Sequence, residues 1–257
     1  MRTVRVTRYV TPLREGGSLP AVVEADDDGL YVLKFRGAGQ GLRALVAELL
    51  TGEIARTLGL PVPEIVLAEL NPDLGRTEPD PEISALIRAS GGLNLGLDYL
   101  PGSIAFDPTV ESVDPTLAAR ILWLDAYVSN VDRTVRNTNL LLWHRRLWLI
   151  DHGASLYFHH VPGWEQTPER ARDPFPLIKD QVLLRRASTL DAVDAALADR
   201  LGPDVLRRLV DLVPAEWLGD GTGRGEEAER LRTAYHRYLV DRLAEPRRFV
   251  EEAERAR

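Results

Sequence analysis

Three polar residues in the middle of the chain, Asp132, Asn137 and Asp151, are of the types that phosphoryl transfer requires. In that reaction the protein has to orient an attacking hydroxyl, hold Mg²⁺ and neutralise charge. One carboxylate can take the proton of the hydroxyl, and an amide with a second carboxylate can hold the metal ion. Each residue alone would more readily be an ordinary turn residue. Their order and spacing together predict phosphoryl transfer from a metal–nucleotide complex.

A helix should lead into this set. The dipeptide Asp114-Pro115 combines a capping residue with a proline, which favours a helix start. Apolar residues then recur at helical spacing as far as about Asn130, so the helix should bury one face. The polar loop that carries Asp132 follows directly.

A short hairpin should bring the third residue back. The apolar runs 140–143 and 147–150 flank a basic turn and are typical of two paired strands. Asp151 comes where the second strand ends, and Gly153 permits a sharp reversal of the chain. We therefore expect Asp151 to fold back toward the loop between the helix and the hairpin.

The segment 129–153 resembles the catalytic and metal-binding loops of the HipA-like kinases and, more distantly, those of phosphoinositide lipid kinases. Those families share a D-x-x-x-x-N loop followed, after a hairpin, by D-x-G. The resemblance implies that Asp132 is the catalytic base, Asn137 a metal ligand and Asp151 the main metal ligand. Eukaryotic protein kinases have H-R-D and D-F-G where this chain has N-V-D and D-H-G, which argues against an ordinary member of that group.

Lysine usage gives an independent indication. The chain's 32 Lys and Arg residues include only two lysines, Lys34 and Lys179, so a retained lysine suggests a site that needs a compact point charge. Lys34 lies inside the β-rich run 30–35, where a charge is unexpected, and on the face opposite Leu33 and Phe35. A kinase would use such a lysine to bind nucleotide phosphates. A snorkelling lysine on an edge strand is the alternative.

An acidic partner for this lysine is expected on the next helix, which the apolar pattern predicts over about 43–58. Glu48 and Glu53 both lie in it, but they point roughly 140° apart and cannot share the role. The resemblance aligns Glu48, seven residues before Ala55 in the E-(x)6-A-(x)3-G-L-P-V-P pattern of HipA-like kinases. We therefore predict that Glu48 pairs with Lys34.

Two glycine clusters could cradle phosphates through backbone N–H groups. Gly16, Gly17 and Ser18 lie between the first two expected strands, where a nucleotide lid belongs, and we predict that they form it. The second cluster, 37–41, lacks the full pattern of a phosphate-binding loop. An ordinary flexible turn is the alternative for each cluster. The resemblance also makes Ser18 a conceivable site of autophosphorylation.

Composition limits the possible classes of protein. The chain has 257 residues, 44% hydrophobic and 28% charged, which suits one large domain or two lobes. It has no cysteine, so disulfides and cysteine-based zinc sites are excluded. A net charge of −7 disfavours binding to nucleic acid. No apolar run approaches the length of a membrane span, and the start lacks a signal-peptide core, so we expect a cytoplasmic protein without membrane contacts.

Residues 1–98 are expected to be rich in strands and 99–257 mainly helical. This pattern and the resemblance imply an α+β, two-lobed protein-kinase-like fold with the glycine-rich crossing 91–101 as its hinge. In a kinase such a hinge reads adenine, and a loop without a ligand is the alternative reading.

A rival site involves histidines. His159 and His160, with Asp151 and His152, could bind a transition metal for hydrolysis. Adjacent histidines in a strand would point to opposite sides, however, and no established metal-binding spacing is present. A structural histidine pair is the favoured interpretation.

We therefore expect an ATP- and Mg²⁺-dependent kinase that transfers the γ-phosphoryl group to a hydroxyl, as the resemblance suggests a Ser or Thr of a protein. Lys179 could contact this acceptor or lie unused on the surface. Small-molecule acceptors stay open, as do an AMP transferase on the same fold and a nucleotide-binding pseudokinase that acts as an interaction module.

Overall fold

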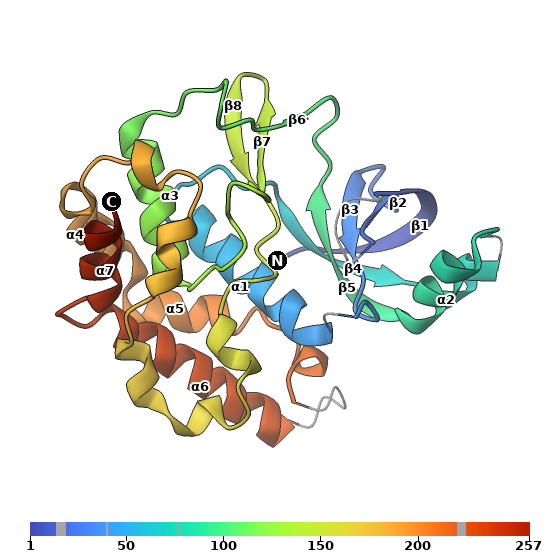
Figure 1. Ribbon diagram of the computed structural model, residues 1–257. Helices are drawn as coiled ribbons and strands as arrows, with labels where there is room; N and C mark the ends of the chain where they lie inside the picture. Colours follow the sequence, from blue (N-terminus) through green and yellow to red (C-terminus); the bar gives the residue numbers. More distant parts are fainter. Residues whose placement is uncertain (14–18, 40, 77, 220–224) are drawn as a thin grey trace. The chain divides into compact units, whose positions relative to one another are not determined.

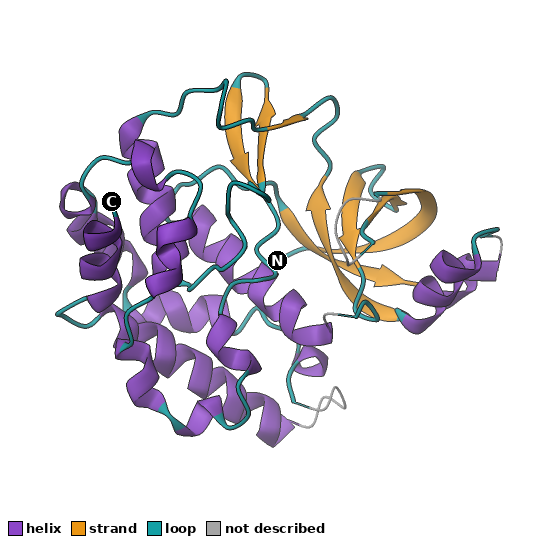
Figure 2. Ribbon diagram, viewed as in Figure 1, coloured by secondary structure: helices purple, strands orange, loops and turns teal. Residues whose placement is uncertain are grey.

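The computed structural model describes residues 1–13, 19–39, 41–76, 78–219 and 225–257 as a mixed α+β protein (Figures 1 and 2). The chain forms two compact units. The first comprises Met1–Leu45 and Pro63–Gly102, and the second comprises Val46–Val62 and Ser103–Arg257. Most of the first long helix therefore belongs with the second unit, whereas the sequence placed it with residues 1–98. The predicted division into functional lobes stays a prediction.

The first unit is built on a closed barrel of five strands in the order β1-β2-β3-β5-β4. Its strands are β1 (Thr3–Pro12), β2 (Ala21–Ala25), β3 (Leu30–Lys34), β4 (Ile65–Leu70) and β5 (Gly92–Asp98). The parallel pairing of β1 with β4 closes the barrel. Register shifts in β1, between Val6 and Arg8 and between Tyr9 and Thr11, give that long strand the bends that closure needs.

Alternating apolar residues fill the barrel. Leu33 is fully buried and Phe35 nearly so, whereas Lys34 between them is partly exposed, as the strand alternation predicts. Gly96 on β5 allows a close approach, because a Cβ there would lie 2.9 Å from Val66 Cγ2. The helix α2 (Pro81–Ala89) adds Ile83 to the same apolar cluster.

Two polar side chains organise the ends of these elements. Asp80 caps α2, since its carboxylate accepts from the backbone N–H groups of Glu82 and Ile83. Asn94 is fully buried in β5, where its amide donates to the carbonyls of Ser90 and Gly92. The predicted hinge is thus strand β5 and the turn that follows it, and its role in binding adenine stays a prediction.

The second unit is mainly helical. Its helices are α1 (Gly41–Thr57, of which 41–45 fall in the first unit), α3 (Pro115–Tyr127), α4 (Asp194–Ala198), α5 (Pro203–Val210), α6 (Gly225–Leu243) and α7 (Arg248–Ala256). A small sheet consists of β6 (Ile104–Ala105), β7 (Leu140–Trp143) and β8 (Arg146–Leu149).

Short 3-10 helices make up much of the remainder. One, η1 (Pro72–Arg76), belongs to the first unit. The second unit contains η2 (Tyr157–His160), η3 (Trp164–Gln166), η4 (Pro168–Arg172), η5 (Pro176–Asp180), η6 (Leu184–Arg186), η7 (Leu190–Ala192), η8 (Asp199–Leu201) and η9 (Ala215–Trp217). Among the described residues, no helix combines the length and the apolar character needed to cross a membrane.

Helix α3 is the centre of the second unit. It begins as predicted, with Asp114 accepting from the N–H of Leu117 at 2.8 Å and Pro115 in the first turn. Residues 118–127 are buried except Arg120, whose guanidinium donates to the carbonyl of Leu58, the residue directly after α1. This contact fixes α1 against α3 and complements the negative end of the α1 dipole.

A buried arginine caps the C-terminal end of α3. Arg242 on α6 donates to the carbonyls of Ala126 and Tyr127 and also to those of Ala171 and Asp173. Burial lowers the pKa of its guanidinium. Four accepting carbonyls therefore satisfy a cation that has been removed from water.

The hairpin β7–β8 forms as predicted, with Leu140 opposite Leu149 and Trp143 opposite Arg146. Its two-residue turn is His144-Arg145, with φ values of 47° and 62°. Positive φ at both positions gives the twist that matches paired strands, although neither residue is of the types usual in such turns. The second strand therefore begins at Arg146, one residue before the predicted start.

Candidate active site

Two of the predicted residues are in direct contact. After α3 the chain reverses at Ser129, where φ is 53°, and enters the loop 130–139. In that loop the amide Nδ2 of Asn137 donates to Asp132 Oδ2 at 2.7 Å. Because the nitrogen is committed to Asp132, the Oδ1 of Asn137 is the atom left to face a cation.

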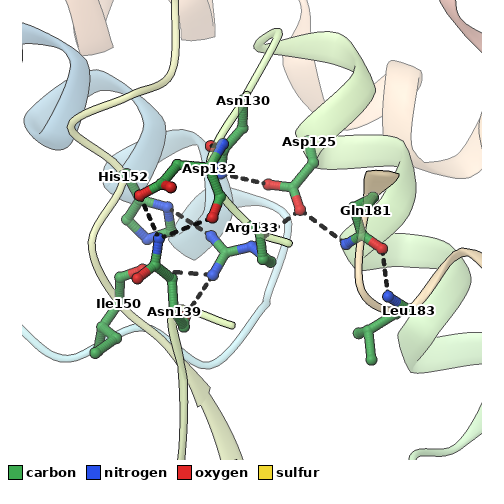
Figure 3. A network of polar contacts seen from close by, with 9 residues as sticks. All are labelled: Asp125, Asn130, Asp132, Arg133, Asn139, Ile150, His152, Gln181 and Leu183. Carbon is green, nitrogen blue, oxygen red and sulfur yellow. Dashed lines mark hydrogen bonds and ion pairs between the residues drawn. The ribbon is translucent and has the colours of Figure 1, made fainter. Parts of the chain in front are cut away.

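A residue that the sequence analysis missed completes this grouping. Asn139 Nδ2 donates to Asp132 Oδ2 at 3.1 Å and to the Asp132 carbonyl at 3.4 Å (Figure 3). Asn130 holds the other side, since its Oδ1 accepts from the N–H of Asp132 at 3.1 Å. Three asparagine side chains thus hold Asp132, two through its carboxylate and one through its backbone N–H, and the repetition of Asn around Asp132 was the pattern in the sequence that could have indicated it.

Arg133, next to Asp132, ties the loop to the hairpin. Its Nε donates to Asp125 Oδ2 at 2.9 Å, and both side chains are 0% exposed. Its Nη1 donates to the carbonyls of Asn139 and Ile150, and its Nη2 to Nδ1 of His152 (Figure 3). A guanidinium can only donate, so His152 accepts through Nδ1.

The third predicted residue, Asp151, is positioned through its neighbours. It follows β8 with φ of 52°, a left-handed conformation that Asp adopts more readily than most residues. Ile150 and His152, on either side of it, are both bound by Arg133. One buried guanidinium therefore holds the segments that carry Asp132 and Asp151.

Asp125 extends the same network to a later segment. Its carboxylate accepts from Asn130 Nδ2 and from Gln181 Nε2, each at 2.9 Å. Gln181 in turn accepts from the N–H of Leu183, and the backbones of Thr134 and Gln181 form an isolated bridge. The last residues of α3, the loop 130–139 and the segment 181–183 are thereby joined (Figure 3).

The sequence matches the family model described as HipA-like kinase over residues 6–241. The chain belongs to the HipA-like kinase family. The resemblance stated from residues 129–153 is thus confirmed. No curated protein matches the sequence.

This HipA-like kinase is also similar to a solved structure, that of the Helicobacter pylori proinflammatory kinase CtkA. The identity is 13%, the TM-score is 0.57, and the match covers 99% of this chain and 98% of the other. At that identity the similarity concerns the fold. The predicted α+β kinase fold is confirmed at this level, and the detailed two-lobed arrangement stays a prediction.

The structure does not test the other residues that were predicted to bind the nucleotide. Lys34 is the last residue of β3 in the first unit, and Glu48 is fully buried in the part of α1 that belongs to the second unit. Their pairing stays a prediction. Gly16, Gly17 and Ser18, expected to form the nucleotide lid, lie outside the described residues.

The strand geometry that argued against a histidine metal site was wrong. His159 and His160 lie in η2 and not in a strand, so their side chains meet, with the Nε2 atoms 3.2 Å apart. His159 Nδ1 is 3.0 Å from the hydroxyl of Tyr235. Among the described residues, no group of three or more His, Cys, Asp or Glu side chains is arranged to hold a metal ion. The pair therefore has the character of a structural contact.

The kinase donor set is of a different kind. The amide of Asn137 and the carboxylate of Asp151 offer hard oxygen ligands, which Mg²⁺ prefers to nitrogen or sulfur. Mg²⁺ also keeps several waters and binds substrate phosphates, so one carboxylate and one amide suffice as protein ligands. The residues present thus fit the ion that kinase chemistry uses.

Proposed function

We propose that this HipA-like kinase transfers the γ-phosphoryl group of ATP to the hydroxyl of a Ser or Thr side chain in a protein. The observation that supports it best is the contact of Asn137 Nδ2 with Asp132 Oδ2 at 2.7 Å, in a loop tied by Arg133 to both neighbours of Asp151. The candidate base is therefore in contact with one candidate oxygen ligand, and the other ligand, Asp151, stands in the chain between two residues that Arg133 binds.

In this proposal Asp132 acts as the base. Its carboxylate accepts the proton of the acceptor hydroxyl as the hydroxyl oxygen forms a bond to the γ-phosphorus. The bond from that phosphorus to the bridging oxygen breaks, and ADP leaves with the electron pair. The proton then passes from Asp132 to solvent.

Asn137 and Asp151 would hold Mg²⁺, which when bound neutralises charge on the phosphates. Lys34 would orient the phosphates, with Glu48 as its partner, and Gly16, Gly17 and Ser18 would cover them. The proposal for Lys34 is supported by the chain's scarcity of lysine and by its position at the end of β3. Lys179 is exposed on η5, where it is accessible to an acceptor.

The test is a mass measurement after incubation with Mg-ATP, with the protein alone, with a mixture of Ser- and Thr-containing peptides, and with small hydroxyl compounds, beside a separate measurement of ATP binding. A gain of one phosphate on the protein or on a peptide supports the proposal. Phosphate transferred only to small hydroxyl compounds would overturn the protein acceptor and keep the kinase. An AMP adduct, or nucleotide binding without any transfer, would overturn the proposal in favour of an AMP transferase or a pseudokinase.

A further inference from the structure

The side-chain amide of Asn139 donates hydrogen bonds to a single residue, Asp132. Both of its N–H bonds go to Asp132, one to the carboxylate Oδ2 at 3.1 Å and one to the backbone carbonyl at 3.4 Å. One contact holds the backbone of Asp132 and the other holds its carboxylate, so together they restrict rotation about the side-chain bonds between the two (Figure 3). Asn139 is also 93% buried, being 7% exposed, so water competes little for these donors.

The two oxygens of Asp132 are consequently unequal. Oδ2 accepts from Asn137 at 2.7 Å and from Asn139 at 3.1 Å. Within the part of the chain that the structure describes, no hydrogen bond from the protein reaches Oδ1. A base needs one oxygen with a free lone pair aimed at the hydroxyl, and a carboxylate held through its other oxygen meets that need.

The backbone of Asn139 is held separately from its side chain. Its carbonyl accepts from Arg133 Nη1 and, at 3.1 Å, from the N–H of Ile150. Its φ of 49° is left-handed, where Asn and Gly are favoured. Glycine can therefore replace Asn139 without strain and without the loss of these backbone contacts.

We propose that Asn139 is a positioning residue for phosphoryl transfer, one that fixes Asp132 through Oδ2 and leaves Oδ1 to take the acceptor's proton. This inference rests on the proposed function. Asn139 would touch neither nucleotide nor acceptor. Its loss should thus lower kcat and leave the KM for ATP unchanged, because the geometry of the base matters only in the transfer step.

Two variants separate this role from a purely conformational one. If Asn139 is present only because its φ is positive, Asn139→Gly should retain full activity. The positioning role predicts that kcat of Asn139→Gly falls roughly 10- to 100-fold. Asn139→Asp keeps the shape and the backbone preference but sets a second carboxylate against Oδ2, so its kcat should fall further.

Thr138→Val is the matched control. Thr138 lies in the same loop as Asn139, and its hydroxyl donates to the carbonyl of Phe106. The substitution removes this contact and leaves the contacts of Asp132 in place. Its kcat should stay near that of the wild type. The thermal unfolding of all three variants shows whether each is folded.

The outcomes are distinct. A wild-type protein that transfers no phosphate to any hydroxyl overturns the proposed function, and this inference with it. An active wild type with an equally active, folded Asn139→Gly overturns the inference alone. A fall in kcat shared by Thr138→Val, or an increase in the KM for ATP in place of the fall in kcat, also contradicts it.

Discussion

Arg133 and Asp125 form an ion pair, Nε to Oδ2 at 2.9 Å, in which both side chains are completely buried. The pair joins the end of α3 to the loop that carries Asp132. A buried charge is tolerated only where its partners are complete, and here Asn130 and Gln181 also donate to Asp125. The most protected ion pair described in this kinase therefore supports its candidate active site.

Breaking this pair should destabilise the protein strongly. Asp125→Asn removes the charge that compensates Arg133, and we expect a loss of about 3 kcal/mol or more in the free energy of unfolding. Urea denaturation measures it. Arg136→Met is the control, since Arg136 is exposed in the same loop and its replacement should change the free energy by less than about 0.5 kcal/mol. A loss below 1 kcal/mol for Asp125→Asn would contradict the structural role.

The second buried arginine should matter for stability alone. Arg242→Met leaves four backbone carbonyls on α3 and near Ala171 without their donor, so the free energy of unfolding should fall by about 2 kcal/mol or more. Thermal unfolding measures the loss. Arg237→Met lies on the same helix in an exposed ion pair and should cost much less. Equal effects of the two substitutions would refute the proposed role of burial.

The barrel offers a prediction about pH. The hydroxyl of Tyr31 and then the guanidinium of Arg2 hold the pKa of Asp27 below its ordinary value of 3.8. A lowered carboxyl pKa stabilises the fold at higher pH, and this stabilisation is lost as pH falls through the folded-state pKa. Asp27→Asn should therefore lower the free energy of unfolding by up to about 1 kcal/mol at pH 7, a small loss because the pair is partly exposed. At a pH well below 3.8 the loss should be smaller, because Asp27 is then protonated in the wild type as well. Urea denaturation of both proteins at the two pH values tests this, and an equal loss at both would contradict it.

The proposed metal ligands predict a change in Mg²⁺ dependence. Asn137→Leu removes one proposed oxygen ligand and Asp151→Asn removes the negative charge of the other, so the Mg²⁺ concentration for half-maximal phosphoryl transfer should rise by roughly tenfold or more in each variant. Titration of activity with Mg²⁺ at fixed ATP measures it, and chelation of the metal should abolish transfer in every variant. An unchanged Mg²⁺ requirement in both variants would remove these residues from the metal site.

Local patterns in the sequence predicted several elements well. The helix expected over about 43–58 is α1, Gly41–Thr57, and the expected hairpin is β7–β8. Apolar periodicity and the capping pair Asp114-Pro115 carried these predictions because they depend on neighbouring residues only. The sequence also placed Asp132 and Asn137 in one polar loop, and the structure shows that their side chains are hydrogen-bonded there.

The buried network around Arg133 could not be predicted from the sequence, because it depends on tertiary contacts. Arg133 was one arginine among many in a chain rich in that residue, and nothing nearby marked it as buried. Its partners Asp125 and His152 are found only once the fold has brought α3 and the hairpin to the same loop. The 3-10 helices between 157 and 217 have no helical periodicity long enough to recognise, which also led to the wrong expectation of a strand at His159.

The role of Asp132 is tested most directly by comparing the turnover and the nucleotide affinity of Asp132→Asn with those of the wild type. The account predicts that kcat falls by roughly 10²- to 10⁴-fold, the range for loss of a general base, while ADP binding stays largely intact. A folded Asp132→Asn protein that still transfers phosphate at the wild-type rate, or that no longer binds nucleotide, would contradict it.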